Sequence, residues 1–335
     1  MRLSASEKQE IIRMVDQSDI GVNKTLKEIG VNKSTFYKWY NAYSKDGIDG
    51  LEPHKRASSR QQWNTIPQAQ KNLVVEIALD YPHLSPRELA YRLTDEQQIF
   101  ISESSVYRIL KNKGLITSPA HILLAAGNEF QNKTSFVHQM WQTDFTYFKI
   151  IGWGWYYLST VLDDFSRYIV HWELCKSMEA DDVKRTVDRA VAKARLKTKK
   201  RPKLLCDNGS CYISKGLKEH LNNEHDIDPI HGRPYHPQTQ GKIERYHRTM
   251  KNVIKLDNYY SPEELERALE IFVKNYNNER YHESLDNLTP ADVYYGRGEQ
   301  ILMQREFIKQ TCLKERKLNY LKLKVKNNLN NLVRK

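Results

Sequence analysis

Three acidic residues stand where a folded domain normally avoids bare charge. Asp144 and Asp207 close runs of strand-forming residues, and Glu244 lies one turn into a helix expected to start after Pro237. Carboxylates brought together from two strands and a helix repel one another, so such a group is expected to bind a hard divalent cation through its oxygens. A single Asp at a strand end is usually a turn residue or a cap. Three acids in this order instead indicate metal-assisted phosphodiester chemistry.

The spacing of the three acids suits a shared metal site. There are 62 residues between Asp144 and Asp207 and 36 between Asp207 and Glu244, which leaves room for a hairpin plus a helix and then for a helix plus a strand. Two Mg²⁺ or Mn²⁺ ions about 4 Å apart could share the trio, one activating the attacking oxygen and the other stabilising the leaving oxygen. Basic residues surround Glu244 and are expected to hold DNA phosphates; these are Lys242, Arg245, Arg248 and Lys251.

The segment 136–298 has the pattern of an α/β domain. Aromatic and β-branched runs predict a first group of three antiparallel strands, at Trp141–Ile150, Gly154–Leu162 and Tyr168–Leu174. Helices and short strands then alternate, at Glu179–Leu196 (helix), Pro202–Cys206 (strand), Ser214–Asn223 (helix), Asp228–Ile230 (strand) and Gln238–Leu256 (helix). The order βββαβαβα predicts a mixed sheet flanked by helices, which is the order of the ribonuclease-H-like fold.

The N-terminal residues 1–50 predict a helix-turn-helix module. Helical spacing covers Ser6–Asp16 and Lys24–Ile29, Gly30 makes a turn, and Asn32 can cap a helix running to Tyr43. We expect Phe36, Trp39 and Tyr40 to pack inward. The exposed face is the candidate DNA-reading surface, formed by Lys33, Ser34, Thr35 and Lys38. The alternative is an ordinary three-helix bundle with a solvated face.

A second all-helical module is expected at residues 64–117. Leu73, Val74 and Ile77 mark one amphipathic helix, Ser85-Pro86 begins another, and Ser102 opens a third that runs to Lys113. This repeats the architecture of the first module, and two tandem readers would contact a longer DNA site than one. The expected DNA-facing residues of the last helix are Ser105, Arg108 and Lys111, although such residues are also common on solvated faces.

Composition favours a polyanionic partner. The chain has 335 residues, 53 Lys and Arg against 41 Asp and Glu, and a net charge of +12, which makes nucleic acid the leading candidate. The excess is +3 over residues 1–135, +1 over 136–300 and +8 over 301–335. The basic tail, 299–335, is expected to be either a helix lying on phosphate or a disordered arm. Linkers are expected at 51–63 and 118–135.

Other classes of site are disfavoured. The four cysteines, Cys175, Cys206, Cys211 and Cys312, show neither a disulfide framework nor zinc-finger spacing, which suits a reducing cytoplasm. No apolar run has the length of a signal peptide or of a membrane-spanning helix, so we expect no membrane partner. A metal bound by histidines is also unexpected at the candidates His231, His236, His247 and His282.

Several ordered motifs resemble one known family. The segments Trp141–Tyr147, Leu162–Arg167, Cys206–Ser210, His236–Arg245 and Tyr276–His282, with Leu288–Ala291, look like those of the integrase-core (DDE) transposases of IS3-type bacterial insertion sequences. The resemblance implies that Asp144, Asp207 and Glu244 are the catalytic triad and that Mg²⁺ or Mn²⁺ is the cofactor. It also implies recognition of terminal inverted repeats, 3′-hydroxyl attack on double-stranded DNA, and homo-oligomeric assembly on that DNA. Asp163 and Asp164 match a turn motif, and we interpret them as structural.

Two departures and two alternatives accompany this resemblance. Many members of the family split the DNA reader and the core between reading frames, whereas this chain fuses them. Retroviral integrases share the core but begin with a His₂Cys₂ zinc module, which this chain lacks.

A catalytically silent or domesticated repressor would bind the same DNA ends and cut nothing, and a plain RNA–DNA nuclease would need no terminal repeat. The intact acidic trio disfavours the repressor, and the two helical modules disfavour the nuclease.

Overall fold

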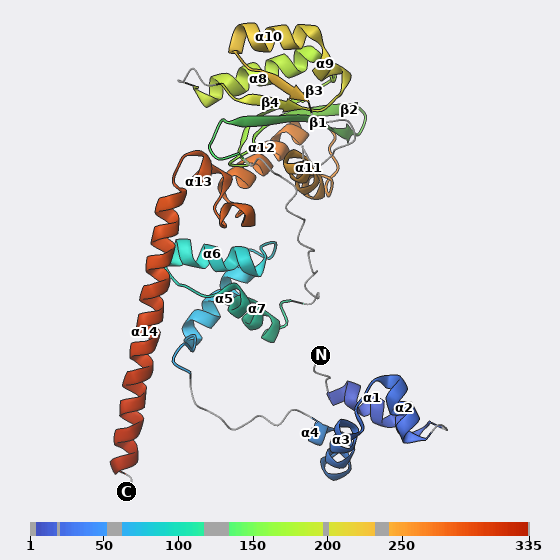
Figure 1. Cartoon of the computed structure of the whole chain (residues 1–335), viewed down its shortest axis with the longest axis vertical. Helices are drawn as coiled ribbons and strands as arrows, with labels where there is room; N and C mark the ends of the chain where they lie inside the picture. The colour runs from blue at the N-terminus through green and yellow to red at the C-terminus, as the bar shows by residue number, and fades with distance from the viewer. Residues whose placement is uncertain are drawn as a thin grey trace. The chain divides into compact units, whose positions relative to one another are not determined.

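The computed structural model describes most of the chain as two compact units, Met1–Gln62 and Trp63–Lys335, and each is considered by itself (Figure 1). The described residues are 5–18, 21–51, 62–116, 134–196, 201–231 and 241–333. Residues 118–133 of the expected linker 118–135, most of the linker 51–63 and the expected start of the last core helix at Gln238 lie outside them.

The first unit contains the expected helix-turn-helix. Its helices are α1 (Ala5–Asp16), α2 (Val22–Ile29), α3 (Lys33–Asp46) and α4 (Ile48–Leu51). The predicted cap is confirmed, because the Asn32 side chain accepts a hydrogen bond from the Ser34 backbone N–H at 3.0 Å. The inward position expected for Tyr40 is wrong, since its side chain is exposed; Tyr43 packs against the core instead. Residues 36, 39 and 43 therefore form the buried stripe of α3.

The first core extends one helix further than the sequence pattern suggests. Helix α4 was not predicted, and its Leu51 is 2% exposed and packs with Ile12, Leu26 and Phe36. The linker expected to begin at residue 51 therefore begins after Leu51, which belongs to the core.

The second helical module has the three expected helices, α5 (Gln68–Asp80), α6 (Pro86–Gln97) and α7 (Glu103–Asn112). Ser85 and Glu88 form a capping box at the start of α6, which fixes where that helix begins. The module has its own core, built from Val74, Leu93 and Val106 among others.

The basic tail forms helix α14 (Gly298–Val333), as one of the two expectations had it; that this helix lies on phosphate stays a prediction. Part of α14 packs on the second helical module. Arg305 makes a bidentate ion pair with Asp95, both N–O distances being 2.7 Å, and Arg316 donates to the Phe100 carbonyl at 2.6 Å. These two cations are therefore committed to protein partners. No helix of the described residues has the length and apolar character needed to cross a membrane.

The core domain is built on a five-stranded mixed sheet in the order β3-β2-β1-β4-β5. The strands are β1 (Met140–Ile150), β2 (Gly154–Asp163), β3 (Ile169–Cys175), β4 (Lys203–Cys206) and β5 (Pro229–His231). The first three pair antiparallel, while β4 pairs parallel to β1 and β5 parallel to β4. The predicted fold class, a ribonuclease-H-like mixed sheet after all-helical modules, is confirmed.

Helices cover both faces of this sheet, as Figure 1 shows. On one face lie α8 (Ala180–Ala194), α9 (Ser210–Ile213) and α10 (Lys215–His225); on the other lie α11 (Gly241–Ile254) and α12 (Pro262–Asn278). Alternation along β1 serves both cores, because Trp141 packs with the first group and Phe148 with the second. The short helix α9 was not predicted. A 3₁₀ turn (Glu283–Leu285) and α13 (Pro290–Tyr294) follow α12.

Candidate active site

Asp144 and Asp207 lie level with each other on neighbouring parallel strands. Strand β4 pairs with β1 so that Lys203 is opposite Met140, an offset of 63 residues. The same offset, continued just past the end of β4, brings Asp207 beside Asp144. Asp144 itself lies in the middle of β1, not at a strand end as expected. This placement arises because β4 is short and β1 continues past its end.

The Asp144 carboxylate is held by its own strand and by a histidine. Its Oδ1 accepts the Phe145 backbone N–H at 2.8 Å, and its Oδ2 lies 3.4 Å from Nδ1 of His247. His247 comes from α11 and is 6% exposed, so its ring is fixed by packing. The side chain of Asp144 keeps 21% of its surface exposed. It is therefore oriented from two sides yet open on the side that a ligand would use.

The Asp207 carboxyl lies in a turn that brings it close to backbone. Burial raises its pKa, the Gly209 N–H lowers it, and the negative charge of Asp144 raises it further. The Gly209 N–H donates to Oδ1 at 2.8 Å, and a Cβ added at Gly209 would lie 2.9 Å from the same oxygen. A side chain at position 209 would therefore force the Asp207 carboxylate to shift; the Gly209 φ of −64° is one that other residues also adopt.

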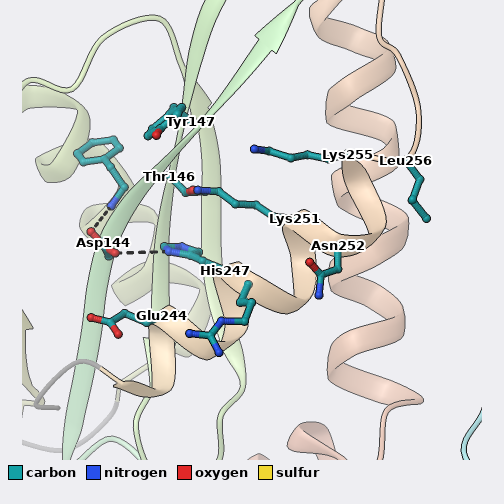
Figure 2. A pocket seen from close by; sticks show the side chains of 11 residues that line it. Asp144, Thr146, Tyr147, Glu244, His247, Lys251, Asn252, Lys255 and Leu256 are labelled. Atoms are coloured by element: carbon teal, nitrogen blue, oxygen red, sulfur yellow. Dashed lines mark hydrogen bonds and ion pairs between the residues drawn. The ribbon is translucent and has the colours of Figure 1, made fainter. Parts of the chain in front are cut away.

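Glu244 faces the same cavity as Asp144. It lies in the first turn of α11, is exposed, and lines with Asp144 an open cavity of about 660 Å³. Figure 2 shows both carboxylates directed to one side, Glu244 from the helix and Asp144 from the strand. Among the described residues, the three acids do not form a group whose ligand atoms all lie within 4.8 Å of one another. They flank one region without closing on a single point.

The start of α11 is fastened to the sheet by a buried polar network. The Gln142 side chain donates from Nε2 to Asp164 at 2.7 Å and accepts the Ile243 backbone N–H through Oε1 at 3.1 Å. Lys242 donates to both the carboxylate and the carbonyl of Asp164. The network fixes the first helical turn, and with it the position of Glu244. The interpretation of Asp164 as structural is confirmed by this network and by its 2% exposure.

Lys242, an expected DNA contact, also has a structural partner in the core, and its contact with DNA stays a prediction. Its ammonium forms an ion pair with Asp164, and its side chain is only 20% exposed. Burial and the nearby Arg167 lower the Lys242 pKa, while Asp164 raises it. A lysine held in this way anchors the start of the helix. Asp163 is likewise structural, since it accepts from Ser166 and His138 while fully buried.

Positive side chains of α11 line the carboxylate cavity. Arg248 and Lys251, both expected DNA contacts, lie there together with Lys255. Lys251 lies over the Tyr147 ring at 4.8 Å; burial and Lys255 lower its pKa, and Asp144 raises it. Lys255 was missed, although its spacing of four from Lys251 was a usable signal. Arg245, also expected here, lines a different cavity and faces away from these residues.

The expected DNA-reading residues lie on the exposed sides of their helices. On α3, Lys33, Ser34 and Lys38 are exposed and Thr35 is half-buried. On α7, Arg108 and Lys111 are exposed and Ser105 is half-buried. Arg108 bonds within its own helix, to the Ser104 carbonyl at 3.0 Å and the Ser105 hydroxyl at 3.2 Å. A DNA contact by Arg108 would therefore require these bonds to exchange.

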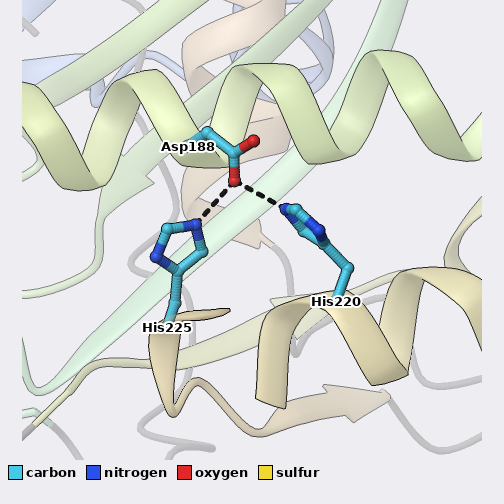
Figure 3. Close-up of side chains that lie close together, drawn as sticks. All are labelled: Asp188, His220 and His225. Atoms are coloured by element: carbon cyan, nitrogen blue, oxygen red, sulfur yellow. Dashed lines mark hydrogen bonds and ion pairs between the residues drawn. The ribbon is translucent and has the colours of Figure 1, made fainter. Parts of the chain in front are cut away.

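A second cluster of possible metal ligands lies between α8 and α10 (Figure 3). Nε2 of His220 and of His225 lie 2.8 and 2.6 Å from the same Oδ1 of Asp188. Burial raises the Asp188 pKa, but its bonds and attraction to the two histidines bring it below the ordinary value. Ligands of a tetrahedral zinc ion stand about 3.3 Å apart, given Zn–N and Zn–O distances of about 2.0–2.1 Å. The closer spacing is that of hydrogen bonds, so we interpret the trio as a link between two helices.

Comparison with known families and structures agrees with this architecture. Residues 136–237 and 225–290 each match a model described as an integrase core domain. Residues 2–52 and 35–110 each match a model described as a homeodomain-like domain. Both descriptions agree with the division into helical modules and a mixed-sheet core.

Solved integrase structures are also similar to the chain. A chain of the simian T-cell lymphotropic virus intasome, solved with the PP2A regulatory subunit B56 gamma, is 19% identical over 66% of this chain and 74% of its own, with a TM-score of 0.43. The BIV integrase catalytic core is 21% identical over 49% and 97%, with a TM-score of 0.36. The HTLV-2 integrase catalytic core, solved with magnesium, is 19% identical over 48% and 96%, with a TM-score of 0.37. The family models thus assign residues 136–290 to an integrase core domain and residues 2–110 to homeodomain-like domains.

Proposed function

We propose that the chain is a DNA transposase of the IS3 type, which binds the terminal inverted repeats of an insertion sequence and catalyses metal-dependent strand cleavage and 3′-hydroxyl strand transfer. The observation that carries the proposal is the placement of Asp144, Asp207 and Glu244. Asp144 on β1 and Asp207 just after β4 are level in the register of these adjacent strands. Glu244 shares with Asp144 a cavity whose lining includes three cationic side chains, Arg248, Lys251 and Lys255.

The acids fit a hard divalent cation. All three offer oxygen, which Mg²⁺ and Mn²⁺ prefer. Burial raises the pKa of Asp207, and the negative charge of Asp144 adds to this. No described residue forms an ion pair with Glu244. Because the three do not close on one point, two ions shared among them suit the geometry better than one. When bound, such ions activate the attacking oxygen and stabilise the leaving oxygen.

The chain's own residues would orient the DNA. Arg248 and Lys251 lie along α11 after Glu244, and Lys255 directly follows the helix, so the three can hold successive phosphates beside the scissile bond. His247 acts on Asp144, as a positioning residue whose buried ring fixes the carboxylate. The exposed faces of α3 and α7 would read the terminal repeats, and two modules on one chain favour assembly of several copies on paired ends.

The test is a strand-cleavage assay with the full chain and a duplex carrying the inverted repeats that flank its gene. Wild-type protein should cleave with Mg²⁺ or Mn²⁺ and not with EDTA, while Asp207→Asn should lose cleavage and keep its affinity for the duplex. Asp257→Asn, a change at an exposed acid outside the site, is the matched control and should cleave normally. Binding without cleavage by wild-type protein in either metal would contradict the proposal and favour a repressor.

A further inference from the structure

A second cationic cavity lies against α11, separate from the one that Asp144 and Glu244 line. It measures about 70 Å³, and the two cavities share no lining residue. Its charged walls are Arg167, Lys242, Arg245 and Arg280, with His282 beside them. Glu244 and Arg245 are consecutive in α11, so one helical turn presents a carboxylate to one cavity and a guanidinium to the other.

Three sequence motifs that the catalytic acids leave unexplained converge on this cavity. Arg167 ends the turn motif Leu162–Arg167, Arg245 ends the motif His236–Arg245 directly after Glu244, and Arg280 belongs to Tyr276–His282. Arg167 is held with a φ of +63°, a conformation that residues other than glycine rarely adopt. Such a backbone persists where the surroundings enforce it and is often found at functional sites. Here it directs a guanidinium into the cavity wall.

The positive charge of the cavity exceeds its local compensation. The Asp164 carboxylate pairs with the Lys242 ammonium, and the Asp164 backbone carbonyl accepts one hydrogen bond from Arg167. By contrast, no described residue hydrogen-bonds or ion-pairs with the guanidinium groups of Arg245 and Arg280.

The acids next to Arg280 in sequence are engaged elsewhere: Glu283 pairs with Arg87, and Glu279 lies 3.7 Å from Arg92. The segment 232–240, which precedes α11, contains no Asp or Glu.

The half-buried His282 lies in the same excess of positive charge. Burial, followed by Arg280, Arg167 and Arg245, lowers the pKa of His282 to about 3, so the ring is neutral at ordinary pH. Its Nε2 is buried and lacks a hydrogen-bond partner among the described residues. A neutral ring carrying its proton on Nε2 would be a donor in need of an acceptor. Two unpaired guanidinium groups and this ring together supply donors and no acceptor.

We propose that this cavity binds one phosphate group of the DNA strand that passes the carboxylate cavity, an inference that rests on the function proposed above. The volume suits a tetrahedral anion and excludes a base or a nucleoside. Guanidinium forks match phosphate oxygens bidentately. A helix about 10–12 Å across separates the two cavities. Because one nucleotide of a strand takes up about 3.4 Å of the duplex axis, the phosphate held in this cavity lies roughly three nucleotides from the reacting phosphate.

A phosphate bound in this cavity would lie at a fixed distance from the catalytic carboxylates. The anchoring charges Arg245 and Arg280 come from α11 and from just after α12, which pack on each other and on the sheet. A phosphate held there would stop the strand from sliding past Glu244, so the anchored strand would present one particular bond to the acids.

The test measures how DNA affinity depends on salt, using the full chain, EDTA and a blunt duplex of arbitrary sequence. The logarithm of affinity falls with the logarithm of salt by about 0.9 per phosphate contact. Arg245→Gln and Arg280→Gln should each reduce that slope by about 0.9, and the double variant should reduce it no further, because one phosphate serves both. The control is Arg267→Gln, an exposed arginine of α12 outside the cavity, which should leave the slope unchanged.

A second measurement distinguishes a DNA phosphate from a free phosphate ion. Slopes equal to wild type in both variants would overturn the proposal. If inorganic phosphate then raised the unfolding temperature of wild-type protein and not that of Arg280→Gln, the cavity would hold free phosphate instead. The assay needs no cleavage, so its failure leaves the strand-transfer proposal standing. Changed slopes in a protein that never cleaves would reject the transposase function and keep a DNA-phosphate site.

Discussion

Replacing Lys242 with methionine distinguishes an anchor of α11 from a DNA contact. Asp164 is 2% exposed and accepts from Gln142 at 2.7 Å, from Thr134 at 2.5 Å and from Lys242. Removing one partner of a buried ion pair typically costs about 3–5 kcal/mol, because the other charge stays buried. We expect about 3 kcal/mol, the lower end, since two donors remain and the Lys242 side chain keeps 20% exposure.

The lowered pKa of Lys242 sharpens this expectation. Burial and Arg167 outweigh the attraction of Asp164, so the pair as a whole adds little stability, while a lone Asp164 carboxylate is costly. The double variant Asp164→Asn/Lys242→Met should therefore recover more than half of the loss.

Urea unfolding followed by tryptophan fluorescence measures both variants. A loss of about 3 kcal/mol lowers the midpoint by roughly 1–1.5 M at a slope of about 2–3 kcal/mol per M. Lys251→Met, a change at the partly exposed lysine that lines the carboxylate cavity, should leave the midpoint near wild type. An unchanged midpoint in Lys242→Met, together with weaker DNA binding, would refute the anchoring role.

Three further predictions concern the supporting structure. Bonds from Arg185 and other donors outweigh burial and lower the Asp182 pKa below its ordinary 3.8, so its stabilisation is present above about pH 4 and lost as pH falls through the folded value. Asp182→Asn should lower stability at pH 6 by about 1–2 kcal/mol and flatten the acid decline in urea titrations. Asp188→Asn should lower the free energy of unfolding by about 1 kcal/mol. ZnCl₂ should not alter the unfolding temperature of wild-type protein. A rise in that temperature with ZnCl₂ that is absent in Asp188→Asn would overturn the hydrogen-bond interpretation. Leu51→Ala should lower the free energy of unfolding by about 2–5 kcal/mol and speed proteolysis of the first unit. Ile48→Ala, at an exposed position, should do neither. Equal digestion of the two variants would show that Leu51 does not belong to the core.

The sequence predicted the elements well because their signals are local. Alternation along β1, the caps at Asn32 and Ser85 and the helical stripes depend on residues a few positions apart, and all appear in the structure. Helices α4 and α9 were missed because each has four residues, too few for periodicity to be seen.

The site was predictable in part for a related reason. That Asp144 and Asp207 meet follows from an element order that makes β1 and β4 neighbours, but the register that levels them is set by pairing, which sequence spacing does not reveal. The roles of Lys242 and Arg245 could not be separated by position in α11, because the difference lies in Asp164, 78 residues away from Lys242. The link from Asp188 to His225 spans 37 residues and was missed likewise.

The central claim is that Asp144, Asp207 and Glu244 hold divalent ions side by side. Anomalous diffraction from crystals of the full chain soaked in Mn²⁺ tests it directly. We expect Mn²⁺ within ligand distance of Asp144 and Asp207, with Glu244 completing the group, and loss of that density in Asp207→Asn. Density only at Asp188, or none at the three acids at saturating Mn²⁺, would contradict it.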